Sequence, residues 1–142
     1  MSLRPTTDPV VVDTDVISFL FRRDSRAELY RPHLSARLLV ISFMTVAELD
    51  RWTLARNWGE DRRRALERHL RSFVIYPFDR ALCRGWAEVS DGARRRGRPI
   101  TTSDAWIAAT ARVHQIPLVT HNAEDYVGVE GLTLITEATT VR

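Results

Sequence analysis

Residues 10–20 read VVVDTDVISFL and lead from β-branched residues through two carboxylates into an apolar stretch. Three consecutive valines are typical of a buried strand, and residues 14–23 carry apolar side chains at the helical period. Asp13 therefore stands where a strand gives way to a helix, and an N-cap carboxylate there contributes roughly 1 kcal/mol. Asp15, in the first helical turn, complements the helix dipole by about 0.3–1 kcal/mol. Taken one at a time, both acids have ordinary structural explanations.

The rest of the chain repeats this alternation of short apolar runs with segments of helical period. We predict further strands at residues 38–41, 73–76, 118–120 and 133–135. We predict further helices at residues 26–34, 45–58, 60–72, 79–96 and 103–115. Because each strand is an unbroken apolar run, both faces of the sheet must be covered. The sequence thus predicts a three-layer α/β/α fold with a central parallel sheet of four to five strands.

Length and composition are those of one globular domain that spans residues 1–142. No repeat, low-complexity tract or Gly/Ser linker marks a domain boundary. The opening MSLRPTTDPV lacks the hydrophobic centre of a signal peptide, and no apolar run reaches the roughly 18 residues of a membrane span. We therefore expect a cytoplasmic protein with no membrane partner. The single cysteine, Cys83, is expected to face the core.

The charge balance says more about partners than about the fold. A formal net charge of +3 and a pI near 9.7 favour a polyanionic partner such as nucleic acid. All 21 basic residues are arginine. The absence of lysine excludes every mechanism that needs a catalytic or phosphate-binding lysine.

Two further acids stand in otherwise apolar segments. Glu48 follows a predicted strand in ISFMTVAELDRW and has no basic residue at i−4 or i+4. A half-buried carboxylate without a partner is costly and is tolerated mainly where it binds a metal or moves protons. The alternative is a solvent-facing side chain paired with Arg51. Asp104 stands in the first turn of SDAWIAATARV, which Ser103 is expected to cap.

Asn122 and Asp125 follow the strand predicted at residues 118–120, in a loop where polar residues often only turn the chain. With them, Asp13, Glu48 and Asp104 stand at or just beyond strand ends, and these ends share the carboxyl edge of a parallel sheet. Like charges gathered there repel one another unless a cation lies between them. An all-oxygen set suits Mg²⁺ or Mn²⁺, because zinc would call for His or Cys and the four histidines show no ligand spacing.

Four blocks of the sequence, VVVDTDVIS, ISFMTVAEL, SDAWIAATA and LVTHNAEDYVGVEGL, stand in an order that resembles the PIN-domain family. The resemblance is specifically to the VapC-type toxins of bacterial toxin–antitoxin pairs, and it extends from residue 10 to about residue 134. It implies a parallel α/β fold and the activity of a Mg²⁺- or Mn²⁺-dependent endoribonuclease. Any one block alone would be a weak signal, and their order makes the likeness specific.

The resemblance also implies roles for individual residues. Asp13 and Asp104 would hold the ion, and Glu48 would bind a water of that ion or a second ion. A metal-activated water would then attack the phosphodiester bond. Family members carry either an acid two residues beyond the Thr that ends the last core strand, or Asn there and an acid three residues later. The second pattern fits this chain, so the fourth site position falls on Asn122 or Asp125.

Residues next to these acids have two possible roles. Asp15 stands where many family members have Asn or Ser, and it is not among the implied ligands. Thr14, Ser42 and Thr45 are able to orient ligands or phosphate, but helix capping and back-bonding explain these hydroxyls equally well.

Arginine-rich runs supply candidate phosphate contacts at residues 62–64 and 94–98. A solvated helix face explains either run equally well. The four tryptophans are able to stack on bases, although their helical spacing favours packing. The better candidate for RNA binding lies just before the helix predicted at residues 103–115 and comprises Arg94, Arg95, Arg96 and Arg98.

By the same resemblance, a VapB-type antitoxin would bind and silence the enzyme, and the chain would form a homodimer.

Two rival classes of protein fail on the sequence. DTDVI resembles the signature of haloacid dehalogenase phosphatases, but Ile17 stands where those enzymes need a threonine. These phosphatases and the receiver domains that accept a phosphoryl group both require a lysine, and this chain has none. A DNA-directed nuclease stays open, because phosphate chemistry alone does not distinguish the sugars. So does a catalytically weak PIN domain that acts as an RNA-binding or antitoxin-binding module.

Overall fold

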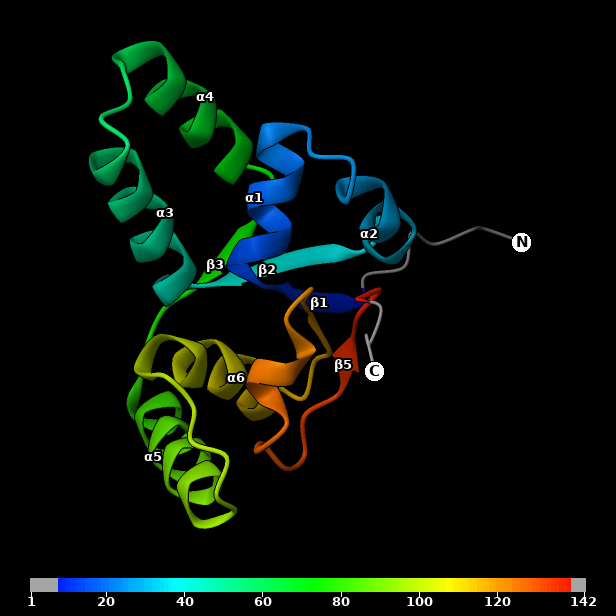
Figure 1. The fold of residues 1–142 in the computed structure, drawn as a ribbon, viewed down its shortest axis with the longest axis vertical. Helices are drawn as coiled ribbons and strands as arrows, with labels where there is room; N and C mark the ends of the chain where they lie inside the picture. The colour runs from blue at the N-terminus through cyan, green and yellow to red at the C-terminus, as the bar shows by residue number, and fades with distance from the viewer. Residues whose placement is uncertain (1–7, 139–142) are drawn as a thin grey trace.

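The computed structural model describes residues 8–138 and shows a twisted sheet between two layers of helices (Figure 1). Within these residues the sheet has five strands in the order β3-β2-β1-β4-β5, and every neighbouring pair is parallel. The predicted three-layer α/β fold with a central parallel sheet is therefore confirmed. The strands are β1 (Pro9–Val12), β2 (Leu38–Ser42), β3 (Val74–Tyr76), β4 (Leu118–Val119) and β5 (Leu134–Ile135).

The helices match the predicted segments to within a few residues at each end. One 3₁₀ helix, η1 (Ala123–Tyr126), was not predicted and follows β4. None of the described helices is long and apolar enough to cross a membrane. The α-helices are α1 (Thr14–Arg22), α2 (Ala27–Leu34), α3 (Phe43–Ala55), α4 (Glu60–Leu70), α5 (Arg80–Arg95) and α6 (Thr102–His114).

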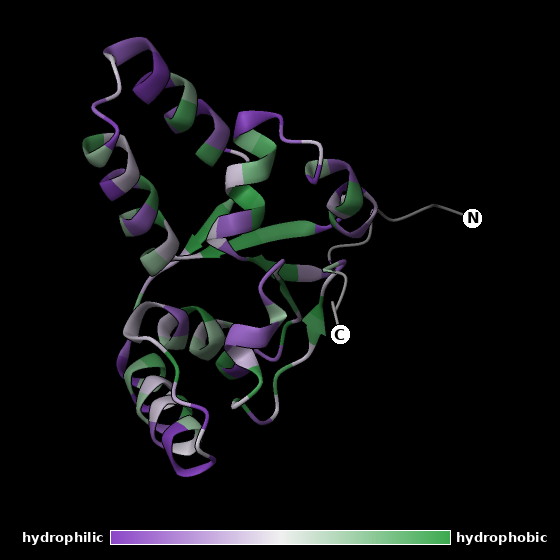
Figure 2. Cartoon of the chain, in the orientation of Figure 1, coloured by the Kyte–Doolittle hydropathy of each residue, from purple (hydrophilic) through white to green (hydrophobic). Residues whose placement is uncertain are grey.

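Successive side chains of a strand point to opposite sides, and at the centre of the sheet both sides are buried, whereas Val74 and Ile75 on the edge strand β3 are exposed. On β1, Val10 and Val12 pack with α1, α2 and α4, whereas Val11 packs with α5 and α6. All three valines are fully buried, and each such side chain stabilises the fold by roughly 1.5–3 kcal/mol. Figure 2 shows the strands as the continuous hydrophobic layer of the molecule. This packing on both sides fixes β1 at the centre of the sheet.

Small residues bring α6 close to the sheet and to α5. Ala105, Ala108 and Ala109 are completely buried on α6. A Cβ atom at Gly85 of α5 would lie only 2.5 Å from Cγ2 of Val113, so glycine is needed for this close approach. The tight packing sets the position of the N-terminal end of α6, where Asp104 lies.

Candidate active site

Asp13 occupies the carboxyl end of the central strand. The register pairs Val12 with Val119, which places Asp13 beside Thr120. Its Oδ1 accepts a 2.7 Å hydrogen bond from the backbone N–H of Thr14 and so caps α1, as its position at the helix start predicts. Its Oδ2 accepts hydrogen bonds of 2.8 Å from the hydroxyls of Thr120 and Tyr126. The carboxylate is 6% exposed and is held by three donors.

Asp15 lies beside Asp13 on the first turn of α1. Its Oδ2 accepts hydrogen bonds from the backbone N–H of His121 at 3.0 Å and from Nδ2 of Asn122 at 2.9 Å. Its Oδ1 is bonded to the backbone N–H of Val16. Asp15 therefore ties α1 to the loop after β4 and places a further carboxylate among the predicted site residues.

Glu48 projects from α3 toward α1. Its Oε1 accepts a 2.8 Å hydrogen bond from the hydroxyl of Thr14, which lies 3.1 Å from the hydroxyl of Thr45. Ser42 caps α3 through the backbone N–H of Met44, the structural role that its position allowed. Within the described residues Glu48 forms no ion pair with an arginine, so the solvent-facing alternative is wrong.

Asp104 lies in the first turn of α6, and two expectations about it were wrong. The N-cap is Thr101, whose hydroxyl accepts from the backbone N–H of Asp104 at 3.2 Å, and not Ser103. Asp104 also does not follow a strand, because α6 succeeds α5 and precedes β4. The residue still reaches the carboxyl edge of the sheet, since α6 runs back from that edge to the start of β4.

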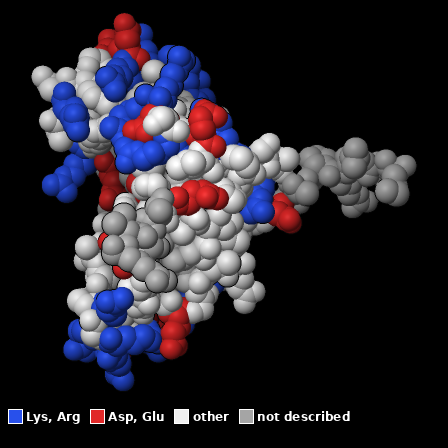
Figure 3. Space-filling view, turned by 45° about the vertical axis from the view of Figure 1, so that its right-hand side comes forward, with Lys and Arg blue, Asp and Glu red and all other residues white. Residues whose placement is uncertain are grey.

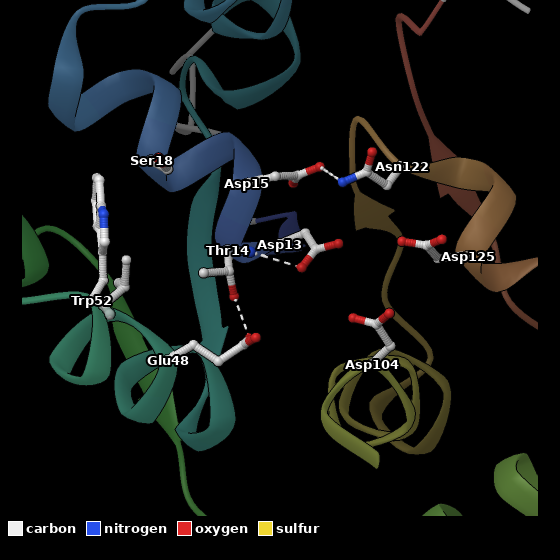
Figure 4. A pocket seen from close by; sticks show the side chains of 10 residues that line it. Asp13, Thr14, Asp15, Ser18, Glu48, Trp52, Asp104, Asn122 and Asp125 are labelled. Atoms are coloured by element: carbon white, nitrogen blue, oxygen red, sulfur yellow. Dashed lines mark hydrogen bonds between the residues drawn. The ribbon is translucent and has the colours of Figure 1, made fainter. Parts of the chain in front are cut away.

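Both candidates for the fourth position lie at the same cleft. Asn122 donates to Asp15, and Asp125 stands on η1, where its charge adds to the burial that raises the pKa of Asp104. Figure 4 shows carboxylates from α1, α3, α6 and η1 facing one space. The pocket has a volume of about 360 Å³ and is lined by Asp13, Thr14, Asp15, Ser18, Glu48, Leu49, Trp52, Asp104, Asn122 and Asp125.

The acids of the cleft are harder to ionise than ordinary carboxyl groups. Burial raises the pKa of Asp13 to about 7, and the charge of Asp15 adds to this, although the hydrogen bonds from Thr120 and Tyr126 oppose it. Burial also raises the pKa of Asp15. It raises the pKa values of Glu48 and Asp104 too, with further repulsion from neighbouring acids. The cleft thus gathers negative charge where water screens it poorly.

The donor set fits a hard divalent cation in kind, because it consists of carboxylate and amide oxygens under mutual repulsion. Burial is the main cause of the raised pKa values of Asp13 and Glu48, and a cation placed among these acids would relieve the repulsion that adds to it. Among residues 8–138, however, no three Asp, Glu, His or Cys side chains already stand as close together as the ligands of one bound ion. The carboxylates of the cleft face one space, but their oxygens lie further apart than the ligands of one bound ion do.

Tyr126 is a site residue that the sequence did not reveal. Its buried hydroxyl donates to Oδ2 of Asp13 at 2.8 Å and lies 3.4 Å from Oδ1 of Asp104. Burial and the neighbouring charge of Asp13 raise the pKa of this phenol, so it stays protonated. The short 3₁₀ turn that directs Tyr126 inward carries no periodic pattern, and only its nearness to Asn122 in the sequence hinted at it.

The arginines predicted to bind RNA lie outside the pocket, on and after the last turn of α5. Arg94 and Arg95 both pair with Asp91, at 3.2 and 2.7 Å. Arg96 pairs with Glu130 at 2.8 Å. Arg98 lines a separate hollow that also includes Asp104. Their role in RNA binding stays a prediction.

Comparison with known families and proteins gives consistent matches. The family model described as PIN domain matches residues 10–128. Ribonuclease VapC1 of Haemophilus influenzae (strain R2866) is 31% identical over 119 residues, which cover 82% of this chain and 88% of the relative.

Solved structures match over most of the chain. VapBC-1 from nontypeable Haemophilus influenzae has a TM-score of 0.76 and 26% identity over 90% of this chain and 97% of that one. The crystal structure of VapBC2 from Rickettsia felis bound to a DNA fragment from its promoter has a TM-score of 0.79 over 90% of this chain and 98% of that one. At 20% identity, the second match shows likeness of fold alone.

Proposed function

This chain belongs to the PIN-domain family, and from that premise we propose that it is a divalent-metal-dependent endoribonuclease, the toxin of a VapBC-type toxin–antitoxin pair. One observation carries the proposal. Folding brings Asp13, Glu48 and Asp104, which lie far apart in the sequence, to one cleft at the carboxyl edge of the sheet. The relative that shares 31% identity is named a ribonuclease, which agrees with this chemistry.

Asp13, Asp104 and Glu48 are the residues that would hold Mg²⁺ or Mn²⁺. The chemistry that such an ion supplies is acidification of water and neutralisation of charge at phosphorus. Thr120 and Tyr126 fix the orientation of the Asp13 carboxylate by donating to its Oδ2. Thr14 fixes Glu48 in the same way. These neighbours hold the acids in place before any ion or substrate arrives.

Glu48 is suited to take a proton from the attacking water. Burial raises its pKa, and its carboxylate points from α3 into the pocket (Figure 4). For the fourth position we assign different roles to the two candidates. Asn122 orients Asp15 through its amide, whereas Asp125 adds negative charge beside Asp104.

The proposed partners follow from the same family membership. RNA is the substrate, and a VapB-type antitoxin is the protein that silences the enzyme. The match to VapBC-1, at 26% identity over nearly the whole chain, supports the antitoxin. A homodimer stays a prediction.

A digestion assay tests the proposal. Single-stranded RNA and DNA of the same sequence are incubated with the chain and Mg²⁺, with Mn²⁺, or with EDTA, beside Asp104→Asn. We expect the RNA alone to be cut, only with a divalent ion, and at least ~100-fold more slowly by the variant. Cleavage of the DNA instead would identify a DNA-directed nuclease. Binding of RNA without cleavage under any ion would favour the RNA-binding module.

A cellular experiment tests the toxin role separately. The chain is expressed without a partner, and the 5′ ends of cellular RNA are mapped beside an Asp104→Ala control. New 5′ ends and arrested growth with the unaltered chain alone support a toxin. Identical RNA ends and growth in both cultures would contradict it.

A further inference from the structure

The acidic cleft continues away from the sheet between α1 and α3. On α1, Ser18 and Arg22 follow Thr14 at intervals of four residues and therefore share its face of the helix. On α3, Trp52 follows Glu48 by the same interval, and Ser18 and Trp52 both line the pocket (Figure 4). Thr14 and Glu48 are hydrogen-bonded across the cleft, and one to two helical turns further out the guanidinium of Arg22 lies 5.7 Å from the ring of Trp52.

Further aromatic and basic side chains lie next to Trp52, and both Trp52 and Trp58 are partly buried against the hydrophobic core. The rings of Trp52 and Trp58 lie 4.7 Å apart. The guanidinium of Arg62, on α4, lies 4.2 Å over Trp58. We call these four side chains the Trp–Arg strip: Arg22, Trp52, Trp58 and Arg62. Figure 3 shows arginines gathered on the lobe that α1 to α4 form in Figure 1.

The arginines of this strip are largely free to bind a ligand. Arg62 forms no ion pair within residues 8–138, and it is exposed. Arg22 approaches Asp24 only at 3.9 Å, and that acid is already bound by Arg26 at 2.8 Å. By contrast, Arg94, Arg95 and Arg96 of the predicted RNA-binding run are paired with acids of the fold.

We propose that the Trp–Arg strip binds the single-stranded RNA next to the scissile phosphate, an inference that rests on the proposed nuclease function. A nucleobase packs against Trp52 at the mouth of the cleft, and the flanking phosphates lie between Arg22 and Arg62. Stacking on aromatic side chains and contact with arginines are how proteins hold single strands without reading a duplex. The strip therefore attracts the polyanion that the bare acids of the pocket repel, and it places one phosphate at them.

Binding of RNA to an inactivated chain tests the strip directly. The probe is a fluorescein-labelled single-stranded RNA of about twelve nucleotides, titrated in Mg²⁺ with Asp104→Asn as the parent. Added to this parent, Trp52→Ala weakens binding roughly 5- to 100-fold, and Trp52→Phe restores most of it. Trp52→Leu keeps apolar bulk without an aromatic face and does not restore binding. Thermal melting confirms that each variant is folded.

Salt dependence separates stacking from charge. Arg22→Ala and Arg62→Ala each reduce the slope of log affinity against log salt concentration by about 0.7, the value for one phosphate contact on a single strand. Trp52→Ala leaves that slope unchanged. Arg84→Ala removes the same charge from α5, where Arg84 pairs with Glu88, and serves as the matched control with no effect on either affinity or slope.

Four outcomes have distinct meanings. Unchanged RNA affinity in Trp52→Ala and Arg62→Ala overturns the strip, even if the unaltered chain cleaves RNA. If Trp52→Ala and Arg62→Ala weaken RNA binding but the unaltered chain cleaves no RNA, the strip is supported and the proposed nuclease function is contradicted. An acidic peptide is also added at the same concentration of charge as the RNA. If it displaces the RNA, and if Trp52→Ala weakens binding of the peptide as it weakens binding of RNA, the strip is a protein-docking surface and the RNA assignment is overturned. Displacement by unlabelled RNA but not by that peptide supports it.

Discussion

The hydroxyl of Tyr126 donates a 2.8 Å hydrogen bond to Oδ2 of Asp13. The same hydroxyl lies 3.4 Å from Oδ1 of Asp104, so one phenol joins an acid at the end of β1 to an acid at the start of α6. It carries a single proton, and the shorter contact shows that Asp13 receives it. The contact stabilises the ionised form of Asp13 and keeps the two carboxylates in a fixed relation.

Replacing Tyr126 by Phe should therefore shift the pH dependence of the nuclease. Without the phenol donor the pKa of Asp13 rises further, because this hydrogen bond lowers it. We expect the acid limb of the pH–rate profile to move to higher pH and kcat at pH 7 to fall roughly 3- to 30-fold. Tyr76→Phe makes the same chemical change on β3, outside the pocket, and should leave the profile in place. An unshifted profile in Tyr126→Phe would show that the phenol does not act on Asp13.

Thr14 makes the hydrogen bond across the cleft that holds Glu48. Thr14→Val keeps the shape of the side chain and removes the donor, so the half-buried Glu48 carboxylate loses its partner. We expect the free energy of unfolding to fall by about 1–2 kcal/mol and cleavage to slow while RNA affinity is kept. Urea unfolding and single-turnover kinetics measure the two effects. Thr53→Val on α3 is the control, because it removes only a hydrogen bond to the backbone of its own helix. It should lower the free energy of unfolding without slowing cleavage.

The stability of the metal-free chain should depend on pH in an unusual direction. Because burial raises the folded-state pKa of Asp13 from 3.8 to about 7, the folded chain binds more protons than the unfolded chain between these values. Stability then falls as the pH rises through this window, by an amount on the order of 3 kcal/mol from Asp13 alone. Burial lowers the pKa of His69, which acts in the opposite sense. Urea unfolding in EDTA at pH 5 and pH 8 measures the sum.

Asp13→Asn isolates the part of this pH dependence that Asp13 causes, because the raised pKa values of Asp15, Glu48 and Asp104 remain in the variant. The variant keeps the side-chain volume and cannot ionise, so the loss of stability between pH 5 and pH 8 should shrink. Hydrogen bonds and ion pairs with arginines lower the pKa values of Asp24 and Asp91, so these acids act below this window. The same pH dependence in the variant and the unaltered chain would contradict the assignment to Asp13.

Much of the fold followed from the sequence because its signals are local. Unbroken apolar runs such as residues 10–12 and 38–41 predict strands buried on both faces, and the helices between them were found from their period. Helix ends were less exact, since they depend on capping contacts. The helix predicted at residues 45–58 begins at Phe43 because Ser42 caps it. No periodic pattern marks a single 3₁₀ turn such as η1.

The candidate site was predictable in membership but not in its internal contacts. Asp13, Glu48 and Asp104 were found because acids in apolar surroundings are costly. Asp15 was given too small a part, because a first-turn acid has an ordinary explanation and its bonds to His121 and Asn122 come from a loop more than 100 residues away. The Tyr126 contact likewise arises only when β4 pairs with β1.

The central claim is that Asp13, Glu48 and Asp104 form one cation site. Calorimetric titration of Mn²⁺ into the metal-free chain at pH 8 tests this claim most directly. We predict binding to the unaltered chain that is lost in both Asp13→Asn and Asp104→Asn, because the two acids come from different elements of one site. Asp61→Asn, an exposed acid on α4, should bind as the unaltered chain does. Equal Mn²⁺ affinity in all four proteins would contradict the claim.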